Sequence, residues 1–495
     1  MMDIDGGAGA EFVESTRNFL QWFQSLPGAT FHQNIRIEDL RERGAGRGII
    51  ATADIEPDTV LFTIPRQAIL CAETSDLATK LPALFAQDAS AAASDDNDGD
   101  DSKSQDGWTL LILMLIHEAL QGSASRWKPY LDILPRRFDT PMFWPALDLA
   151  ELQASDVVAK IGKADADAMI RTRILPTIHA NSAAFFPAGT APLSDEDLWE
   201  LAHRMGSTIM AYAFDLESDD APSEKESTPE DDWVEDHAPP TILGMVPLAD
   251  LLNADATFNA HINHSPAALT AVALRAVPAG TEILNYYGPL PNSELLRRYG
   301  YVTPAHARHD VVELPWALIQ SHLRAPLRAL SDTQWAAATA SVEDADDTFV
   351  LERATDDPDA TGQIATLATF AGLPEELTDA VKTFLKGVLK AAPRAAAFLE
   401  DKTARKAVIL EGVHGALGER EGQYATTLEE DDALLGNGAR GRKEMAVWVR
   451  RGEKNLLREA REWVAGQLDE ARRAGLSRGR EYEEGDGQAA KRRRR

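Results

Sequence analysis

The fold is decided by two runs near the middle of the chain, GTEILNYYG at residues 280–288 and ELLRRYGYV at residues 294–302. Together they place four tyrosines within 16 residues of a chain that has only eight. Tyrosine combines an apolar ring with a hydroxyl, so such a group suits a core and a binding pocket equally well. If residues 285–288 form a strand, Tyr286 and Tyr287 point to opposite faces, and only one of them can face a ligand.

Two earlier segments have a composition that would bring backbone and amides close to a ligand. GAGRG at residues 44–48 allows close approach to the backbone. A dinucleotide fingerprint would need a helix next, whereas here Ile49-Ile50 and a turn at Pro57 follow, which predicts a hairpin of strands. MVPLADLLNAD at residues 245–255 ends an apolar run in Asn253, and a buried amide must be fully hydrogen-bonded. Alone, each segment is also compatible with a plain turn.

The order of patterns along the 495 residues predicts an α+β fold. Strand-like runs at 44–65 and 242–287 are separated by helical patterns, so we expect the two β regions to pair across the insertion and share one domain. Low-complexity acidic loops interrupt the chain at 86–107 and 217–240. From about residue 316 the chain is rich in Ala, Leu, Glu and Arg and is predicted to be helical.

The three segments, in this order, resemble the SET domain, and the branch looks like the Rubisco large-subunit methyltransferase class, nearest to its fungal ribosomal lysine methyltransferases. Further matching stretches lie at 107–108, 126–130, 141–144, 210–214 and 442–454. The resemblance implies a β-rich SET domain at 11–310, split by a helical insertion at about 75–241. An all-α substrate-binding domain at 311–475 and a disordered tail at 476–495 with a basic end would follow.

The resemblance also implies a function, which is methyl transfer from S-adenosyl-L-methionine to a protein lysine. The residues implied to bind this cofactor are Ala45, Gly46, Arg47, Tyr212, Asn253, Ala254 and Tyr287, and Tyr287 is also the implied catalytic tyrosine. The residues implied to contact the substrate are Trp108, Asp215, Tyr299 and Tyr301. No metal is expected.

One departure from the family pattern concerns Asn253-Ala254, where many SET domains have Asn-His. Contacts from the imidazole would be lost, while backbone contacts can remain. Two alternatives therefore stay open: a protein-histidine methyltransferase of the same fold, and a non-catalytic module that binds basic proteins.

Charge and composition restrict the partners. With 50 Lys+Arg against 79 Asp+Glu, the formal net charge is −29, which argues against direct nucleic-acid binding and favours a basic protein partner. That the partner is a ribosomal protein rests on the resemblance alone. The single cysteine, Cys71, leaves no internal disulfide or cysteine-built zinc cluster.

Location is predicted from the ends and the apolar runs. Residues 1–10 lack a secretory pattern, and the most apolar stretch, 108–116, is too short to cross a bilayer, so no membrane partner is expected. The basic run KRRRR at 491–495 predicts nuclear import, with the cytoplasm left open as a further location. We expect a monomer.

Overall fold

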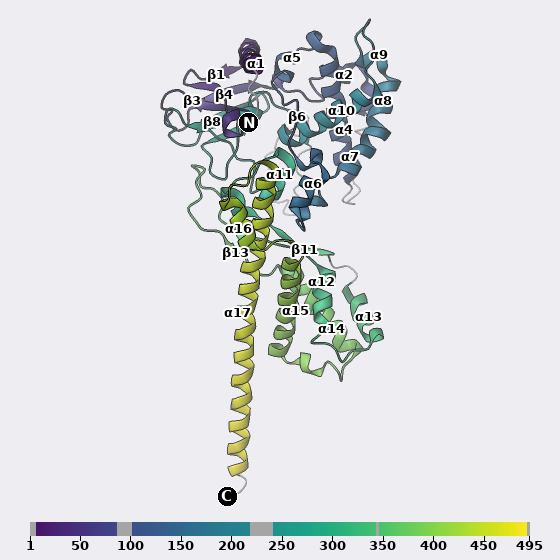
Figure 1. Ribbon diagram of the computed structural model, residues 1–495, viewed down its shortest axis with the longest axis vertical. Helices are drawn as coiled ribbons and strands as arrows, with labels where there is room; N and C mark the ends of the chain where they lie inside the picture. Colours follow the sequence, from purple (N-terminus) through teal and green to yellow (C-terminus); the bar gives the residue numbers. More distant parts are fainter. Residues whose placement is uncertain (1–5, 87–100, 218–240, 343–345, 493–495) are drawn as a thin grey trace, which may run out of the picture.

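The computed structural model describes residues 6–86, 101–217, 241–342 and 346–492. Figure 1 shows the strands of the first half beside the N-terminal helix, the helical insertion next to them, and the C-terminal helices below both. None of the described helices is long and apolar enough to span a membrane.

Two small antiparallel sheets form the β region, and each joins strands from both sides of the insertion. The three-stranded sheet has the order β2 (Ile35–Asp39), β3 (Arg47–Ala51), β9 (Glu282–Ile283). The four-stranded sheet has the order β1 (Thr30–Phe31), β4 (Val60–Pro65), β8 (Ala268–Ala273), β7 (Ala260–His264). Ile49 pairs with Ile283 and Thr63 with Thr270, so the two β regions share one domain, as predicted.

The predicted hairpin between the first two strands is wrong. β3 and β4 lie in different sheets, and the chain between them crosses from one sheet to the other, held by a bridge between Ile55 and Val277. The reason lies in β3, where Ile49 and Ile50 are both buried. β3 is the central strand of its sheet, and its two edges are already paired with β2, which precedes it, and with β9, so no edge is left for β4.

The insertion supplies most of the helices around this β region. α4 (Asp101–Gln121) begins inside the predicted acidic loop 86–107, of which residues 87–100 lie outside the described residues. Its run LLILMLI at 110–116 is entirely buried, and α10 (Asp195–Tyr212) packs beside it. The other helices are α2 (Asp76–Lys80), α5 (Lys128–Leu131), α6 (Ala146–Leu149), α7 (Lys163–Met169), α8 (Leu175–Ala180) and α9 (Ser182–Phe185).

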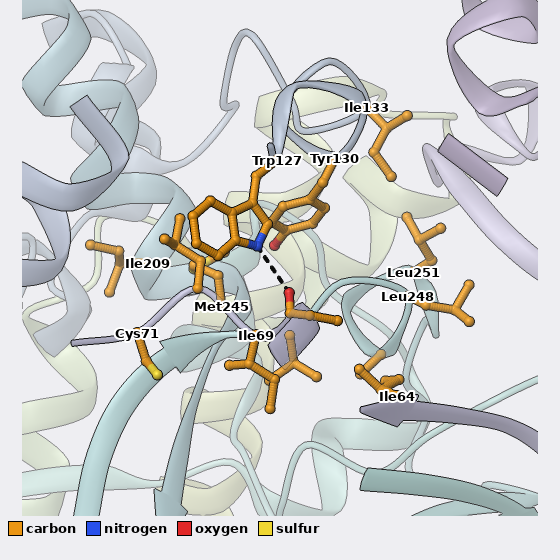
Figure 2. Packing of buried hydrophobic residues seen from close by; sticks show 14 of the residues in the cluster. Ile64, Ile69, Cys71, Trp127, Tyr130, Ile133, Ile209, Met245, Leu248 and Leu251 are labelled. Carbon is orange, nitrogen blue, oxygen red and sulfur yellow. Dashed lines mark hydrogen bonds between the residues drawn. The ribbon is translucent and has the colours of Figure 1, made fainter. Parts of the chain in front are cut away.

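Sheet and insertion share one hydrophobic core (Figure 2). Trp127 is buried within it, and its indole N–H donates to the Ala68 carbonyl over 3.0 Å. This bond satisfies the one polar group of a large apolar side chain, so the insertion is fixed to the chain that follows β4.

The C-terminal region is mainly helical, as predicted, and also carries strand pairs that the sequence patterns did not predict. Its helices are α12 (Trp316–Leu323), α13 (Asp332–Thr339), α14 (Glu375–Ala391), α15 (Lys402–Gly422), α16 (Leu428–Gly436) and α17 (Gly441–Arg492), with α11 (Asn292–Tyr299) leading into them. The strand pairs are β10 (Val312–Pro315) with β11 (Thr348–Leu351), and β12 (Arg353–Ala354) with β13 (Thr369–Phe370).

The long helix α17 differs from the predicted disordered tail. It runs away from the body in Figure 1 and continues to Arg492, through most of the predicted tail 476–495. Arg, Glu and Ala, which are good helix formers, make up 8 of the 17 residues 476–492, although three glycines also lie there. Residues 493–495 of the basic run lie outside the described residues.

Buried polar groups join the insertion to the C-terminal helices. The Glu453 carboxylate, on α17, accepts from Ser155 Oγ over 2.6 Å and from the Tyr424 hydroxyl over 2.8 Å. Nearby, Arg420 pairs with Asp156 over 2.9 Å. Burial raises the pKa of Glu453 from 4.5 to about 8. Between these two pH values the carboxyl is protonated in the folded protein and ionised in the unfolded chain.

The raised pKa of Glu453 predicts that stability falls as the pH rises. Its stabilising protonation is complete below about pH 4.5 and is lost as the pH passes about 8. Glu453→Gln removes the ionisation and keeps the shape. We expect the free energy of unfolding of the variant, relative to the wild type, to increase between pH 6 and pH 8 by up to about 1.4 kcal/mol per pH unit. Urea titrations at both pH values measure it, and a constant difference would contradict the assignment.

Candidate active site

The glycine-rich segment forms a tight turn before β3. Gly44 has a φ of 79°, and the Leu40 N–H donates to the Gly46 carbonyl over 2.9 Å. Gly48 has no room for a side chain, because a Cβ there would lie 2.7 Å from Glu282 Oε1 and 2.9 Å from Asn253 Nδ2. Gly46 has open space around the same position. The two glycines therefore differ in role, and only Gly48 is required for packing.

Asn253 connects this turn to β9. Its Nδ2 donates to Glu282 Oε1 over 2.7 Å and to the Arg47 carbonyl over 3.2 Å. Its own carbonyl accepts from the Asn285 N–H over 2.8 Å, and Ala254 forms a parallel bridge with Asn285. The predicted residues 253 and 254 thus lie against both the glycine turn and the tyrosine segment.

A cleft of about 340 Å³ opens beside this junction. It collects Gly46, Arg47, Tyr212 and Asn253, four of the predicted cofactor residues, from separate parts of the chain. The rest of its lining is Glu11, Phe12, Ser15, the segment 132–136, Asp250 and Leu251. Its size lies within the range of small-molecule sites. A larger cleft of about 800 Å³ in the insertion contains none of the predicted residues.

Three of the predicted tyrosines form a row. The rings of Tyr287 and Tyr299 are stacked, with centroids 4.9 Å apart and an interplanar angle of 23°, and Tyr301 lies 6.1 Å beyond Tyr299. The Tyr287 hydroxyl donates to the Leu252 carbonyl over 2.7 Å. Burial raises the pKa of Tyr287 well above its ordinary value, helped by Tyr301, Tyr299 and Tyr212, so Tyr287 is a neutral phenol at physiological pH.

Tyr286 lies outside this row. Its ring stacks on Phe258, with centroids 4.7 Å apart. The two neighbouring tyrosines therefore have different environments, as expected from their alternation along an extended chain.

Two predicted substrate residues, Trp108 and Asp215, neither line the cleft nor belong to the tyrosine row. Trp108 is half-buried on α4 and packs against the main core. Asp215 is exposed on β5 (Ala213–Glu217), opposite Leu243 of β6 (Thr241–Met245). Their proposed roles stay predictions.

Asp250 is a site residue that the sequence patterns did not single out. It is buried, lines the cleft, and accepts from the Tyr130 hydroxyl through Oδ2 over 2.6 Å. Its Oδ1 has no hydrogen-bond partner among the described residues. Burial raises its pKa from 3.8 to about 7. The signal was an acidic residue inside the apolar run 245–252, where a carboxyl must be buried with a partner.

The chemistry available is that of a cluster of phenols in which Tyr287 is neutral and its hydroxyl bonds Leu252, the residue before Asn253 of the polar cleft. In the part of the chain that the structure covers, no group of three or more His, Cys, Asp or Glu is placed to hold a metal ion. The neighbouring His261 and His264 are exposed.

Comparison with known proteins matches two family models to this chain. The model described as SET domain matches residues 46–288, and the model described as Rubisco LSMT substrate-binding matches residues 368–457. The chain therefore contains a SET domain followed by a Rubisco LSMT substrate-binding domain. All the predicted cofactor residues except Ala45 fall inside the first match.

Individual relatives agree with this assignment. The chain is 32% identical over 312 residues to Ribosomal lysine N-methyltransferase 4 of Saccharomyces cerevisiae, covering 61% of this chain and 58% of the yeast protein. It is 33% identical over 265 residues to the human N-lysine methyltransferase SETD6, covering 52% and 49%. The chain thus spans 58% of the length of the yeast relative and 49% of the length of the human one.

A solved structure described as Rubisco LSMT bound to AdoMet has the same fold. It superposes with a TM-score of 0.60 at 19% identity, over 92% of this chain and 93% of the other.

The two glycines of the turn give a prediction that separates packing from binding. Gly48→Ala should lower the free energy of unfolding by about 1–3 kcal/mol, because Leu40, Glu282 and Asn253 must all move to admit the Cβ. Gly46→Ala should leave it within about 1 kcal/mol, since the position is open. Urea denaturation of both variants measures the difference. Equal losses would show that the turn does not pack as described.

Proposed function

We propose that this protein is an S-adenosyl-L-methionine-dependent protein-lysine N-methyltransferase that acts on a basic protein, with a ribosomal protein as the first candidate. The observation that carries the proposal is the row of Tyr287, Tyr299 and Tyr301, which is tied to the cleft because Tyr287 bonds Leu252, the residue before the cleft residue Asn253. The names of the relatives, two lysine methyltransferases, and the AdoMet-bound neighbour support it.

The tyrosine row suits the acceptor. A lysine has a reference pKa of about 10.4, so losing its proton at pH 7 costs about 4–5 kcal/mol. A dry aromatic channel disfavours the ammonium form and lowers this cost. The Tyr287 hydroxyl donates its hydrogen bond to the Leu252 carbonyl. The lone pairs of its oxygen therefore remain to accept a hydrogen bond from an amine N–H. It would therefore orient a neutral amine and would not remove the proton itself.

The cleft suits the cofactor. Open space at Gly46 lets a ligand approach the backbone. The Asn253 amide nitrogen is used within the protein, so its amide oxygen remains to accept from the ligand. When bound, the cofactor's sulfonium would supply the methyl group. The chain's part is alignment of the acceptor with that group, which accounts for much of such a rate enhancement.

Tyr287→Phe tests the catalytic assignment, with Tyr286→Phe as the matched control. Each change removes one hydroxyl and almost no volume. Tyr287→Phe should lower kcat by about 100-fold with little change in cofactor affinity, because the oriented contact to the amine is lost. Tyr286→Phe should leave kcat within a few-fold, since its ring stacks on Phe258.

Steady-state methylation assays measure kcat, and calorimetry measures cofactor affinity separately. The reverse pattern would place the catalytic tyrosine one residue earlier, and full activity of both variants would remove Tyr287 from the mechanism.

The proposed substrate is tested with tritiated cofactor on purified ribosomal proteins, followed by mass spectrometry of the modified residue. We expect label on lysine. Label on histidine would show that the acceptor is histidine and not lysine, and no label despite tight protein binding would leave only a binding module.

Because the net charge is −29, raising salt should lower kcat/KM mainly through slower association with the basic substrate. Turnover independent of salt would contradict electrostatic steering.

A monomeric state and a nuclear location complete the proposal. The location rests on the basic run 491–495, of which only residues 491 and 492 belong to the described chain.

A further inference from the structure

The Arg47 side chain lines the cleft, and its guanidinium hydrogen-bonds two other segments that also line it, the N-terminal helix and residues 132–136. It donates through Nε to Thr16 Oγ1 and through Nη2 to Ser15 Oγ, both over 2.9 Å, and both acceptors lie on helix α1 (Gly6–Ser25). Nη1 donates over 2.9 Å to the carbonyl of Ile133, in the segment 132–136 that also lines the cleft. One side chain thus fixes the distance between α1 and the segment 132–136.

Phe12 is the aromatic residue that α1 contributes to the cleft. The Arg47 guanidinium lies 3.8 Å from its ring centroid, and that of Arg41 lies 4.0 Å away. These cation–π contacts hold the Phe12 ring in place although Phe12 is not part of the main hydrophobic core. At the cleft's edge, Glu11 pairs with Arg136 over 3.0 Å, and both side chains are well exposed.

The two halves of α1 are attached to the protein in different ways. Phe19 and Phe23 are fully buried in the main core, so the second half of α1 can separate from the protein only when the domain unfolds. The first half is half-buried or exposed, with Val13 53% exposed, and it is held by the polar and cation–π contacts above. Segments with few buried apolar contacts open at low free energy.

We propose that the first half of α1, residues 9–16, is a lid over the cofactor cleft, and that Arg47 is the positioning residue that holds it closed. This inference rests on the proposed function, because it takes the cleft ligand to be S-adenosyl-L-methionine. The lid sets how long the ligand stays bound, through Phe12, while the tyrosine row carries out alignment.

The test compares Phe12→Ala and Arg47→Met with Val13→Ala, which changes an exposed neighbour on the same turn. In the full-length protein, the dissociation rate of S-adenosyl-L-methionine is measured by stopped-flow displacement. We expect it to rise about tenfold or more in Phe12→Ala and Arg47→Met, and to stay within twofold in Val13→Ala. Arg47→Lys should lie in between, because it retains the charge and loses the forked hydrogen bonds.

Hydrogen exchange distinguishes a lid from a general loss of stability. In the wild type and in Val13→Ala, bound cofactor should slow exchange at residues 9–16, whereas in Arg47→Met this protection should be lost and residues 19–25 should exchange as before. Unchanged dissociation in folded Phe12→Ala and Arg47→Met would refute the lid alone. A wild-type chain that binds no S-adenosyl-L-methionine would refute the proposed function itself.

Discussion

The site depends on the hydrogen bonds of the Asn253 side-chain amide. Its nitrogen bonds the Arg47 carbonyl and the Glu282 carboxylate, which come from two strands 235 residues apart in sequence numbering, β3 and β9. The strands pair through only two registered positions, Ile49 with Ile283 and Ile50 with Glu282. Backbone hydrogen bonds of Ala51 with Thr281 and Gly280 hold one end of this pairing, and the Asn253 amide holds the other end, where the glycine turn meets the tyrosine segment.

Sequence patterns could predict this arrangement only in part. The pairing of β regions across the insertion follows from strands interrupted by helices, and the opposed environments of Tyr286 and Tyr287 follow from alternation. The partners of β3 and β4 could not be deduced locally, because a turn at Glu56-Pro57-Asp58 is equally suited to a hairpin and to a crossover between sheets. The pairing of β3 with β2 and β9 in the folded protein decides it, because both edges of β3 are then occupied.

The side chains of the cleft show the same limit. The glycine turn and Asn253 were identifiable from their residue types. The role of the Arg47 side chain was not, because its partners Phe12, Ser15, Thr16 and Ile133 lie between 31 and 86 residues away. Asp250 was hidden for a related reason: a carboxyl in an apolar run needs a partner, and that partner, Tyr130, lies 120 residues earlier.

Residues 248–254 connect these contacts into one unit. Leu248 has a φ of 81°, a conformation that non-glycine residues adopt only where the surroundings impose it. From there, Asp250 accepts from Tyr130, the Leu252 carbonyl accepts from Tyr287, and Asn253 bonds the glycine turn. The tyrosine row and the cleft are thus anchored on adjacent residues, 252 and 253. A displacement of this segment would move both together, so the spacing between the tyrosine row and the cleft does not depend on the contacts that hold the first half of α1.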